Sequence, residues 1–214
     1  MKIGYLSPGR RYEHEEGARR RRILESYQSG DLIITMLESD EGPATIETPE
    51  DEVAVIPAMV ELARNCKKDF DAYIIGCAGD VGISELRKTV SIPVIGPARV
   101  SHAVAAAMYT TYGILAVNAC YAAEEKKRIA SMGLSDQVAA IEVLGIRVAE
   151  IVDYPERILR KIAEAARQCH VPAVVPACMS MAFLLAERDV MDIDGICIVN
   201  PLRCAIRFAV GIVA

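Results

Sequence analysis

Short apolar runs alternate along the chain with longer segments in which apolar residues recur every three or four positions. The short runs are bounded by turn residues and predict buried strands, whereas the longer segments predict amphipathic helices. The expected strands are Lys2–Leu6, Leu32–Leu37, Ala72–Gly76, Pro93–Ile95, Gly113–Val117, Val138–Val143, Ala173–Pro176 and Gly195–Val199. The expected helices are Tyr12–Gln28, Pro49–Lys68, Val81–Lys88, Ala98–Tyr109, Tyr121–Met132, Pro155–Gln168, Met179–Arg188 and Pro201–Val213.

This regular alternation of strand and helix predicts an α/β fold, in which parallel sheets carry helices on both faces. Continuously apolar strands, such as AVVP at 173–176, suit a sheet that is covered on both sides. Proline followed by glutamate marks two helix starts, at Pro49 and Pro155. The polar segment Asp40–Thr48, with Gly-Pro at its centre, predicts a loop that is either a lid or an ordinary connection.

The two halves of the chain resemble each other in the order of their features. Ile92–Met108 and Ile196–Ile212 align at a fixed offset, which matches Pro97 with Pro201. Each half therefore predicts a unit of four parallel strands with its helices. A chance similarity between two α/β halves is the alternative interpretation.

Two of these strands end in a cysteine, and this feature organises the prediction of a site. The stretch DAYIIGCAGDVG ends its apolar run at Cys77, and AVVPACMSM ends its run at Cys178. Ligands of parallel sheets bind at the carboxyl ends of the strands. A pseudo-two-fold relation between the halves would bring both thiols to opposite walls of one cleft. A buried cysteine at a strand end is more often a small core residue, so the inference depends on the matched pair.

A pair of thiols suits the inversion of a carbon next to a carbonyl. One group must remove a proton from one face of the carbon, while a second, protonated group returns a proton to the other face. The ordinary thiol pKa of about 8.5 is readily shifted, and a following helix start favours the thiolate. Backbone N–H groups of Gly79 and Asp80 could cradle a substrate oxygen, and Met179 and Ser180 form the matching turn. This chemistry requires no cofactor.

Composition and charge limit the alternatives. Hydrophobic residues make up 52% of the 214 residues and aromatic residues only 5%, which predicts a folded chain with an aliphatic core. The net charge of −5 argues against nucleic acid as a partner. No apolar run is long enough to span a bilayer, and the first residues predict a strand rather than a signal peptide. Seven cysteines without an export signal predict free thiols and a cytoplasmic location, and the absence of Cys-x-x-Cys argues against structural zinc.

Other conspicuous residues have simpler interpretations. We expect His102 at a surface or interface, and the arginine run 19–22 on a solvated or subunit-facing helix. Arg10 and Arg11 are either solvated loop charges or contacts to an anionic substrate. We expect the matched arginines Arg99 and Arg203 to have capping or interface roles. The cysteines without matched context are expected to be structural: Cys66, Cys120, Cys169, Cys197 and Cys204.

Four stretches together resemble the aspartate/glutamate racemase superfamily, in its hydantoin racemase-like branch. They are GCAGDVG at 76–82, IPVIGPARVSHAVAA at 92–106, PACMSMA at 176–182 and ICIVNPLRCAIRFA at 196–209. The resemblance implies two pseudo-symmetric Rossmann-like lobes, each a four-stranded parallel sheet flanked by helices, with the active site in the cleft between them. It also implies that the C-terminal helix returns to the first lobe, so the lobes would be 1–97 with 201–214, and 98–200.

The same resemblance implies roles for particular residues. Cys77 and Cys178 would be the catalytic acid/base pair, and Ser7 and Asn118, after the first strand of each half, would contact substrate. Gly79 and Asp80 match the cradle after the first thiol. The resemblance implies a small-molecule substrate, no cofactor and a homo-oligomer.

The sequence also departs from relatives of the glutamate type. Glutamate racemases carry Asn-Thr and Thr-His after their two cysteines, whereas this chain has Ala78-Gly79 and Met179-Ser180. We therefore expect a cofactor-independent racemase or epimerase that acts on a hydantoin or an amino-acid-like substrate. The alternatives are a maleate-type cis-trans isomerase, a malonate-type decarboxylase, or a small-molecule-binding protein without turnover.

Overall fold

The computed structural model describes residues 1–66 and 69–213. The chain divides into two compact units, Met1–Pro97 with Ala205–Ala214, and Ala98–Cys204. The helices are α1 (His14–Glu25), α2 (Pro49–Asn65), α3 (Ile83–Thr89), α4 (Pro97–Met108), α5 (Ala119–Ser131), η1 (Ser135–Gln137), α6 (Val148–Asp153), α7 (Pro155–Gln168), α8 (Met179–Glu187) and α9 (Pro201–Val213). The strands are β1 (Lys2–Arg10), β2 (Ile33–Ser39), β3 (Ala72–Ile75), β4 (Val94–Ile95), β5 (Tyr112–Ala116), β6 (Val138–Val143), β7 (Ala173–Pro176), β8 (Asp192–Ile193) and β9 (Ile196–Ile198).

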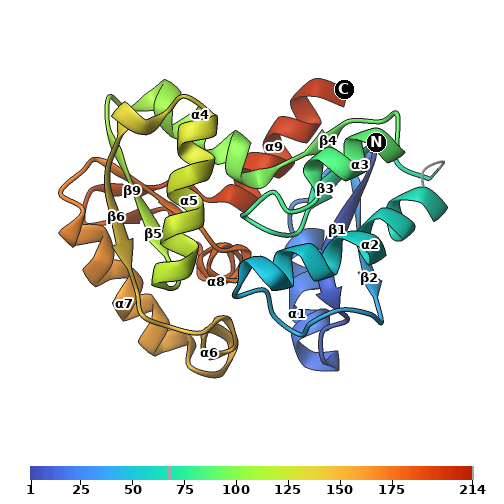
Figure 1. The fold of residues 1–214 in the computed structure, drawn as a ribbon, viewed down its shortest axis with the longest axis horizontal. Coiled ribbons are helices and arrows are strands. Elements are labelled where there is room, and N and C mark those ends of the chain that lie inside the picture. Colours follow the sequence, from blue (N-terminus) through green and yellow to red (C-terminus); the bar gives the residue numbers. More distant parts are fainter. Residues whose placement is uncertain (67–68, 214) are drawn as a thin grey trace. The chain divides into compact units, whose positions relative to one another are not determined.

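The first unit contains a four-stranded parallel sheet in the order β2-β1-β3-β4 within the described residues. Helix α2 packs against β1 and β2, and α3 packs against α2 and β4 (Figure 1). Ile3 pairs with Ala72 and Leu6 with Ile75, so the carboxyl end of β3 lies beside Leu6, in the middle of β1. The fold class expected from the alternation of strand and helix is confirmed here.

The second unit contains a five-stranded sheet in the order β6-β5-β7-β9-β8, again within the described residues. Strands β6, β5, β7 and β9 are parallel, and helices α5 and α7 both contact β5 and β6 (Figure 1). The short strand β8 pairs antiparallel with β9 and was not anticipated. Two residues with only one apolar side chain between them produce no alternating pattern, and helix α6 is also too short for a clear period.

Strand β1 is longer than predicted, because it continues through Ser7, Pro8 and Gly9 to Arg10. Pro-Gly normally marks a turn, but the pairing register with β2 shifts between Leu6 and Arg10, so the strand bends and then resumes. The expected helix 49–68 ends at Asn65, and its last two expected residues, 67 and 68, lie outside the described residues.

The expectation of a solvated position was wrong for Arg20, within the run 19–22, and for His102, because both side chains are buried beside a carboxylate. Arg20 is buried on α1, where its Nε donates to Glu16 Oε1 at 2.6 Å and its guanidinium stacks 4.1 Å from the centre of the Tyr12 ring. His102 is only 1% exposed, with its Nε2 2.6 Å from Glu125 Oε1. The sequence places Glu125 on another helix, so no local pattern reveals this pair.

Candidate active site

Cys77 lies two residues beyond β3, at the carboxyl edge of the first sheet. Gly76 precedes it, and a Cβ built on Gly76 would lie 2.6 Å from the Leu6 carbonyl oxygen and 2.8 Å from Pro8 Cδ. Glycine is therefore the residue that lets β1 and β3 approach each other at this point. This close approach of the two strands fixes the backbone position of Gly76, and with it the position of the neighbouring Cys77.

The turn after Cys77 folds back on the thiol itself. The Gly79 N–H donates to Cys77 Sγ at 3.4 Å, and the Asp80 N–H donates to the Cys77 carbonyl at 3.2 Å. Asp80 has a φ of 53°, a left-handed conformation that a side chain rarely adopts. An N–H aimed at sulfur favours the thiolate, because it stabilises the negative charge.

The local structure after Cys77 differs from the expected helix start. Helix α3 begins only at Ile83, and Gly82 precedes it with a φ of 68°. The stabilising N–H group therefore comes from the turn, not from a helix terminus. Cys77 is buried, with 7% of its surface exposed.

Cys178 is held differently, as the N-cap residue of α8. Its backbone is extended, and its carbonyl accepts the Ala182 N–H at 3.0 Å. The positive end of the helix dipole favours a thiolate at this position. Met179 and Ser180 open the helix and are both buried, while Cys178 is 9% exposed.

Of the remaining predicted contacts, Asn118 follows the carboxyl end of β5, whereas Ser7 lies inside β1. Ser7 is buried within β1, just after the residue that pairs with Ile75, and not in a loop beyond the strand. Asn118 is the N-cap of α5, and its Oδ1 accepts the Tyr121 N–H at 2.8 Å. This bond caps the first turn of α5 with the side-chain oxygen of Asn118.

Asn200 is a buried polar residue at the same edge of the second sheet, and the sequence analysis did not single it out. Its Oδ1 accepts from the N–H groups of Leu202 at 3.0 Å and Arg203 at 3.3 Å, which caps α9. Its Nδ2 donates to the Ala182 carbonyl of α8 at 2.9 Å. The available signal was Asn before Pro201, since an N-cap residue followed by proline marks a helix start.

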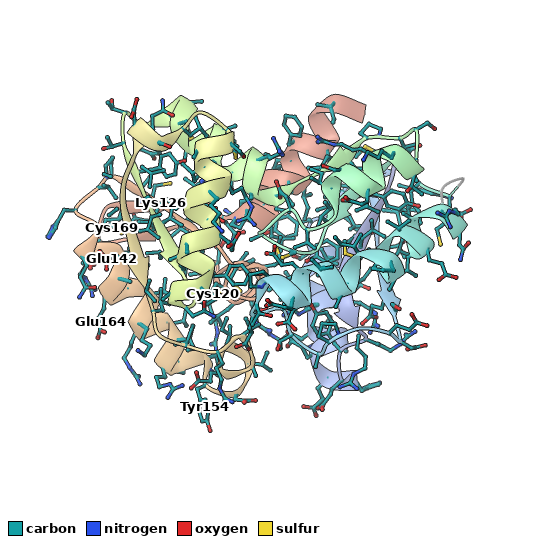
Figure 2. The ribbon with its side chains drawn as sticks, viewed as in Figure 1. Cys120, Lys126, Glu142, Tyr154, Glu164 and Cys169 are labelled. Carbon is teal, nitrogen blue, oxygen red and sulfur yellow. The ribbon has the colours of Figure 1, made fainter. Side chains whose placement is uncertain are left out.

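The cysteines outside the matched pair lie in other environments. Burial raises the pKa of the Cys169 thiol to about 11, and burial raises that of Cys204 to about 11 as well. Thiols of this kind are poor nucleophiles and poor bases at neutral pH. Cys120 is exposed on the first turn of α5 (Figure 2).

Within the second unit, a hollow of about 470 Å³ lies between α5 and β6. Ala122, Lys126 and Ala140 are among the residues that line it, and Figure 2 shows Lys126 on α5. None of the predicted site residues lines this hollow, so we do not assign the chemistry to it.

Three further features of the described residues bear on the site. Arg11 forms an exposed ion pair with Asp40 at 2.9 Å, so its charge already has a partner. Among residues 1–66 and 69–213, no three His, Cys, Asp or Glu side chains gather as a set of metal ligands. In the same residues, no helix has both the length and the apolar content needed to cross a bilayer.

Known proteins provide an independent comparison. A hydantoin racemase of Paenarthrobacter aurescens is 23% identical over 188 residues, which cover 85% of this chain and 79% of that protein. A hydantoin racemase of Pseudomonas sp. strain NS671 is 25% identical over 205 residues, which cover 92% of this chain and 82% of that protein.

The fold is shared with solved structures as well. An allantoin racemase from Klebsiella pneumoniae superimposes with a TM-score of 0.85 at 18% identity, covering 99% of this chain and 87% of that chain. The family model described as Asp/Glu/Hydantoin racemase matches residues 20–209. The chain therefore belongs to the Asp/Glu/hydantoin racemase family and is a racemase.

Proposed function

We propose that this racemase is cofactor-independent and that Cys77 and Cys178 are its acid/base pair. The observation that supports the proposal most is the matched placement of the two thiols. Each follows the carboxyl end of a buried parallel strand, and each has a local source of stabilisation for a thiolate. The mechanism requires both sulfur atoms to flank one carbon of the substrate.

The proposed reaction moves one proton in and one proton out. The thiolate of one cysteine takes the proton from the carbon next to the carbonyl, and the electron pair of the C–H bond moves into the carbonyl to form an enolate. The thiol of the other cysteine then donates its proton to the opposite face of that carbon. The substrate leaves with inverted configuration, and the two cysteines have exchanged their protonation states.

A 5-substituted hydantoin is the proposed substrate class. The curated relatives described above are hydantoin racemases, and allantoin, the substrate named for the structural relative, is itself a hydantoin substituted at C5. The turns Ala78-Gly79 and Met179-Ser180 also lack the Asn-Thr and Thr-His pairs of glutamate racemases. A ring carbonyl on each side of the substrate offers oxygen atoms to polar groups at the strand ends.

We propose that several polar groups orient this ring. The hydroxyls of Ser7 and Ser180 and the amide nitrogen of Asn118 are suited to the ring carbonyls and ring nitrogens. Met179 would supply an adaptable apolar contact to the substituent at C5. The Gly79 N–H would serve the thiolate of Cys77 and not a substrate oxygen, because it is aimed at the sulfur.

The test is exchange of the substrate hydrogen with solvent. Optically pure 5-alkylhydantoins, amino acids and small diacids are incubated with the enzyme in D₂O, and deuterium at the carbon next to the carbonyl is measured alongside optical rotation. We expect deuterium uptake together with loss of optical rotation for hydantoins, well above the rate without enzyme. Conversion of a diacid without such exchange, or no turnover of any hydantoin, would refute this assignment of substrate and mechanism.

A further inference from the structure

The two halves of the chain begin corresponding helices in different ways. In the second unit, Asn200 immediately precedes Pro201, the first residue of α9, and its side-chain oxygen accepts from the N–H groups of the second and third residues of that helix. This is the arrangement expected of an N-cap residue. The repeat aligns Pro201 with Pro97, so the position that corresponds to Asn200 is occupied by Gly96.

Gly96 has no side chain with which to cap α4, which begins at Pro97. The first turn of α4 also contains no acidic residue of its own. The place of the missing side chain is nevertheless filled. A Cβ built on Gly96 would lie 2.7 Å from Asp80 Oδ1, and closer still to Asp80 Cγ and Oδ2.

From this geometry we propose that the carboxylate of Asp80 replaces the missing side chain of Gly96 and caps α4, and that this cap positions the turn that carries Cys77. Asp80 is 6% exposed, and a buried carboxylate needs donors to offset its lost hydration. The first N–H groups of a helix are such donors, and the positive end of the helix dipole adds to the attraction.

The cap explains why an aspartate occupies the left-handed backbone conformation at position 80. Its φ of 53° would favour glycine, which suggests that the side chain has a role that outweighs the cost. The Asp80 N–H closes the turn onto the Cys77 carbonyl, and the neighbouring Gly79 N–H contacts the sulfur. If the carboxylate is anchored, both contacts are held in place. Asp80 is then a positioning residue for the thiol and not a ligand of the substrate.

Three variants separate these roles. Asp80→Gly removes the cap but accepts the left-handed backbone, and Asp80→Asn keeps a capping oxygen without the charge. Asp80→Gly combined with Gly96→Asn moves the cap to residue 96, as in the other half of the chain. Asp194→Gly is the matched control, because Asp194 has a φ of 54° and only an exposed ion pair with Arg167.

The structural part of the proposal is measured without turnover. We expect Asp80→Gly to lower Tm by about 2–4 °C and to speed hydrogen exchange in the first turn of α4. Asp80→Asn and the double variant should recover most of both losses, and Asp194→Gly should change neither. Equal Tm values for Asp80→Gly and the unmodified protein, or no recovery in the double variant, would overturn the cap.

The positioning part rests on the proposed function of Cys77 and has its own readouts. Alkylation of Cys77 by iodoacetamide, followed by peptide mass spectrometry across pH, should show a higher apparent thiol pKa in Asp80→Gly and recovery in the double variant. With an optically pure 5-alkylhydantoin, kcat should fall on the order of tenfold with KM little changed, since a 1 Å misplacement can cost about 100-fold. A raised KM with unaltered Tm and alkylation would instead assign Asp80 to the substrate. A lower Tm in Asp80→Gly, together with no turnover of hydantoin by the unmodified protein, would support the cap and reject the proposed function.

Discussion

The two thiol-bearing turns lie at corresponding strand ends, but different local structures hold them. Cys77 lies in a turn of small residues that folds back on the sulfur, whereas Cys178 opens a helix that is buried from Met179 to Leu185. The first thiol receives the Gly79 N–H of its own turn, and the second lies at the positive end of a helix dipole. The comparison shows that the two halves place a cysteine after corresponding strands and surround it with different local structure.

The largest effect should come from removing either thiol. We expect Cys77→Ala and Cys178→Ala each to lower the rate of racemisation by about 10²–10⁴-fold, because each removes one partner of the proton transfer. Racemisation of an optically pure 5-alkylhydantoin, followed by polarimetry, measures the loss.

Cys120→Ala is the control for this prediction, because Cys120 is exposed on α5 and outside the matched pair. It should retain activity. A loss confined to one of the two variants would break the symmetry between the turns and favour a single-thiol mechanism, as in the isomerase or decarboxylase alternatives.

The next largest expected effect is a loss of stability when a buried ion pair between two helices of the second unit is removed. His102 on α4 and Glu125 on α5 are both buried, and Arg128 also bonds Glu125. Glu125→Ala removes the carboxylate that bonds both His102 and Arg128, so we expect a loss of about 3–5 kcal/mol in the free energy of unfolding. Urea denaturation measures this loss. Glu124→Ala, which removes only a largely exposed pair with Lys127, should cost less than about 1 kcal/mol.

The same carboxylate predicts a dependence of stability on pH. Burial alone would raise the pKa of Glu125, but the bonds and charges of His102 and Arg128 lower it below its ordinary value. The stabilisation is therefore complete above the ordinary carboxyl pKa of about 4.3 and is lost as pH falls through the lower folded value. Urea midpoints between pH 6 and pH 3 should fall less steeply in Glu125→Gln, and equal slopes would contradict the assignment.

The smallest expected effect is a change in stability when the residue before either cysteine is replaced. Gly76 has no room for a methyl group beside the Leu6 carbonyl, whereas the corresponding residue of the second half, Ala177, carries one in the core. We expect Gly76→Ala to destabilise by about 1–3 kcal/mol, because backbone must move. Ala177→Gly should cost about 1 kcal/mol through lost burial and added chain entropy. Equal Tm values for Gly76→Ala and the unmodified protein would show that β1 and β3 can separate at this point.

The sequence predicted those elements whose residues interact locally. The bounds of β6, β7 and α7 match the expected ranges, because each has a clear apolar pattern and a turn or proline at its start. The edge strand β8 and the helix α6 escaped prediction, since both are too short to show a period. The continuation of β1 through Pro8 and Gly9 also escaped it, because its register is set by pairing with β2.

The sequence predicted where the candidate site residues lie along the chain, but not which distant residues they contact. Two cysteines after apolar runs are visible in the sequence, and so is the order of the turns that follow them. The burial of His102 depends on Glu125, 23 residues away, and the environment of Asp80 depends on Gly96. Such pairs form only when distant segments meet, and a single sequence contains no signal for which segments do so.

The burial of most of α8 has a consequence for changing the selectivity of this enzyme. Seven consecutive residues, from Met179 to Leu185, are enclosed in the second unit, so new side chains there would have to displace well-packed neighbours. The loop at 78–82 lies outside regular secondary structure, but its residues 78–81 are buried as well. Libraries designed to accept bulkier substituents should therefore leave both segments intact and diversify their less buried surroundings first.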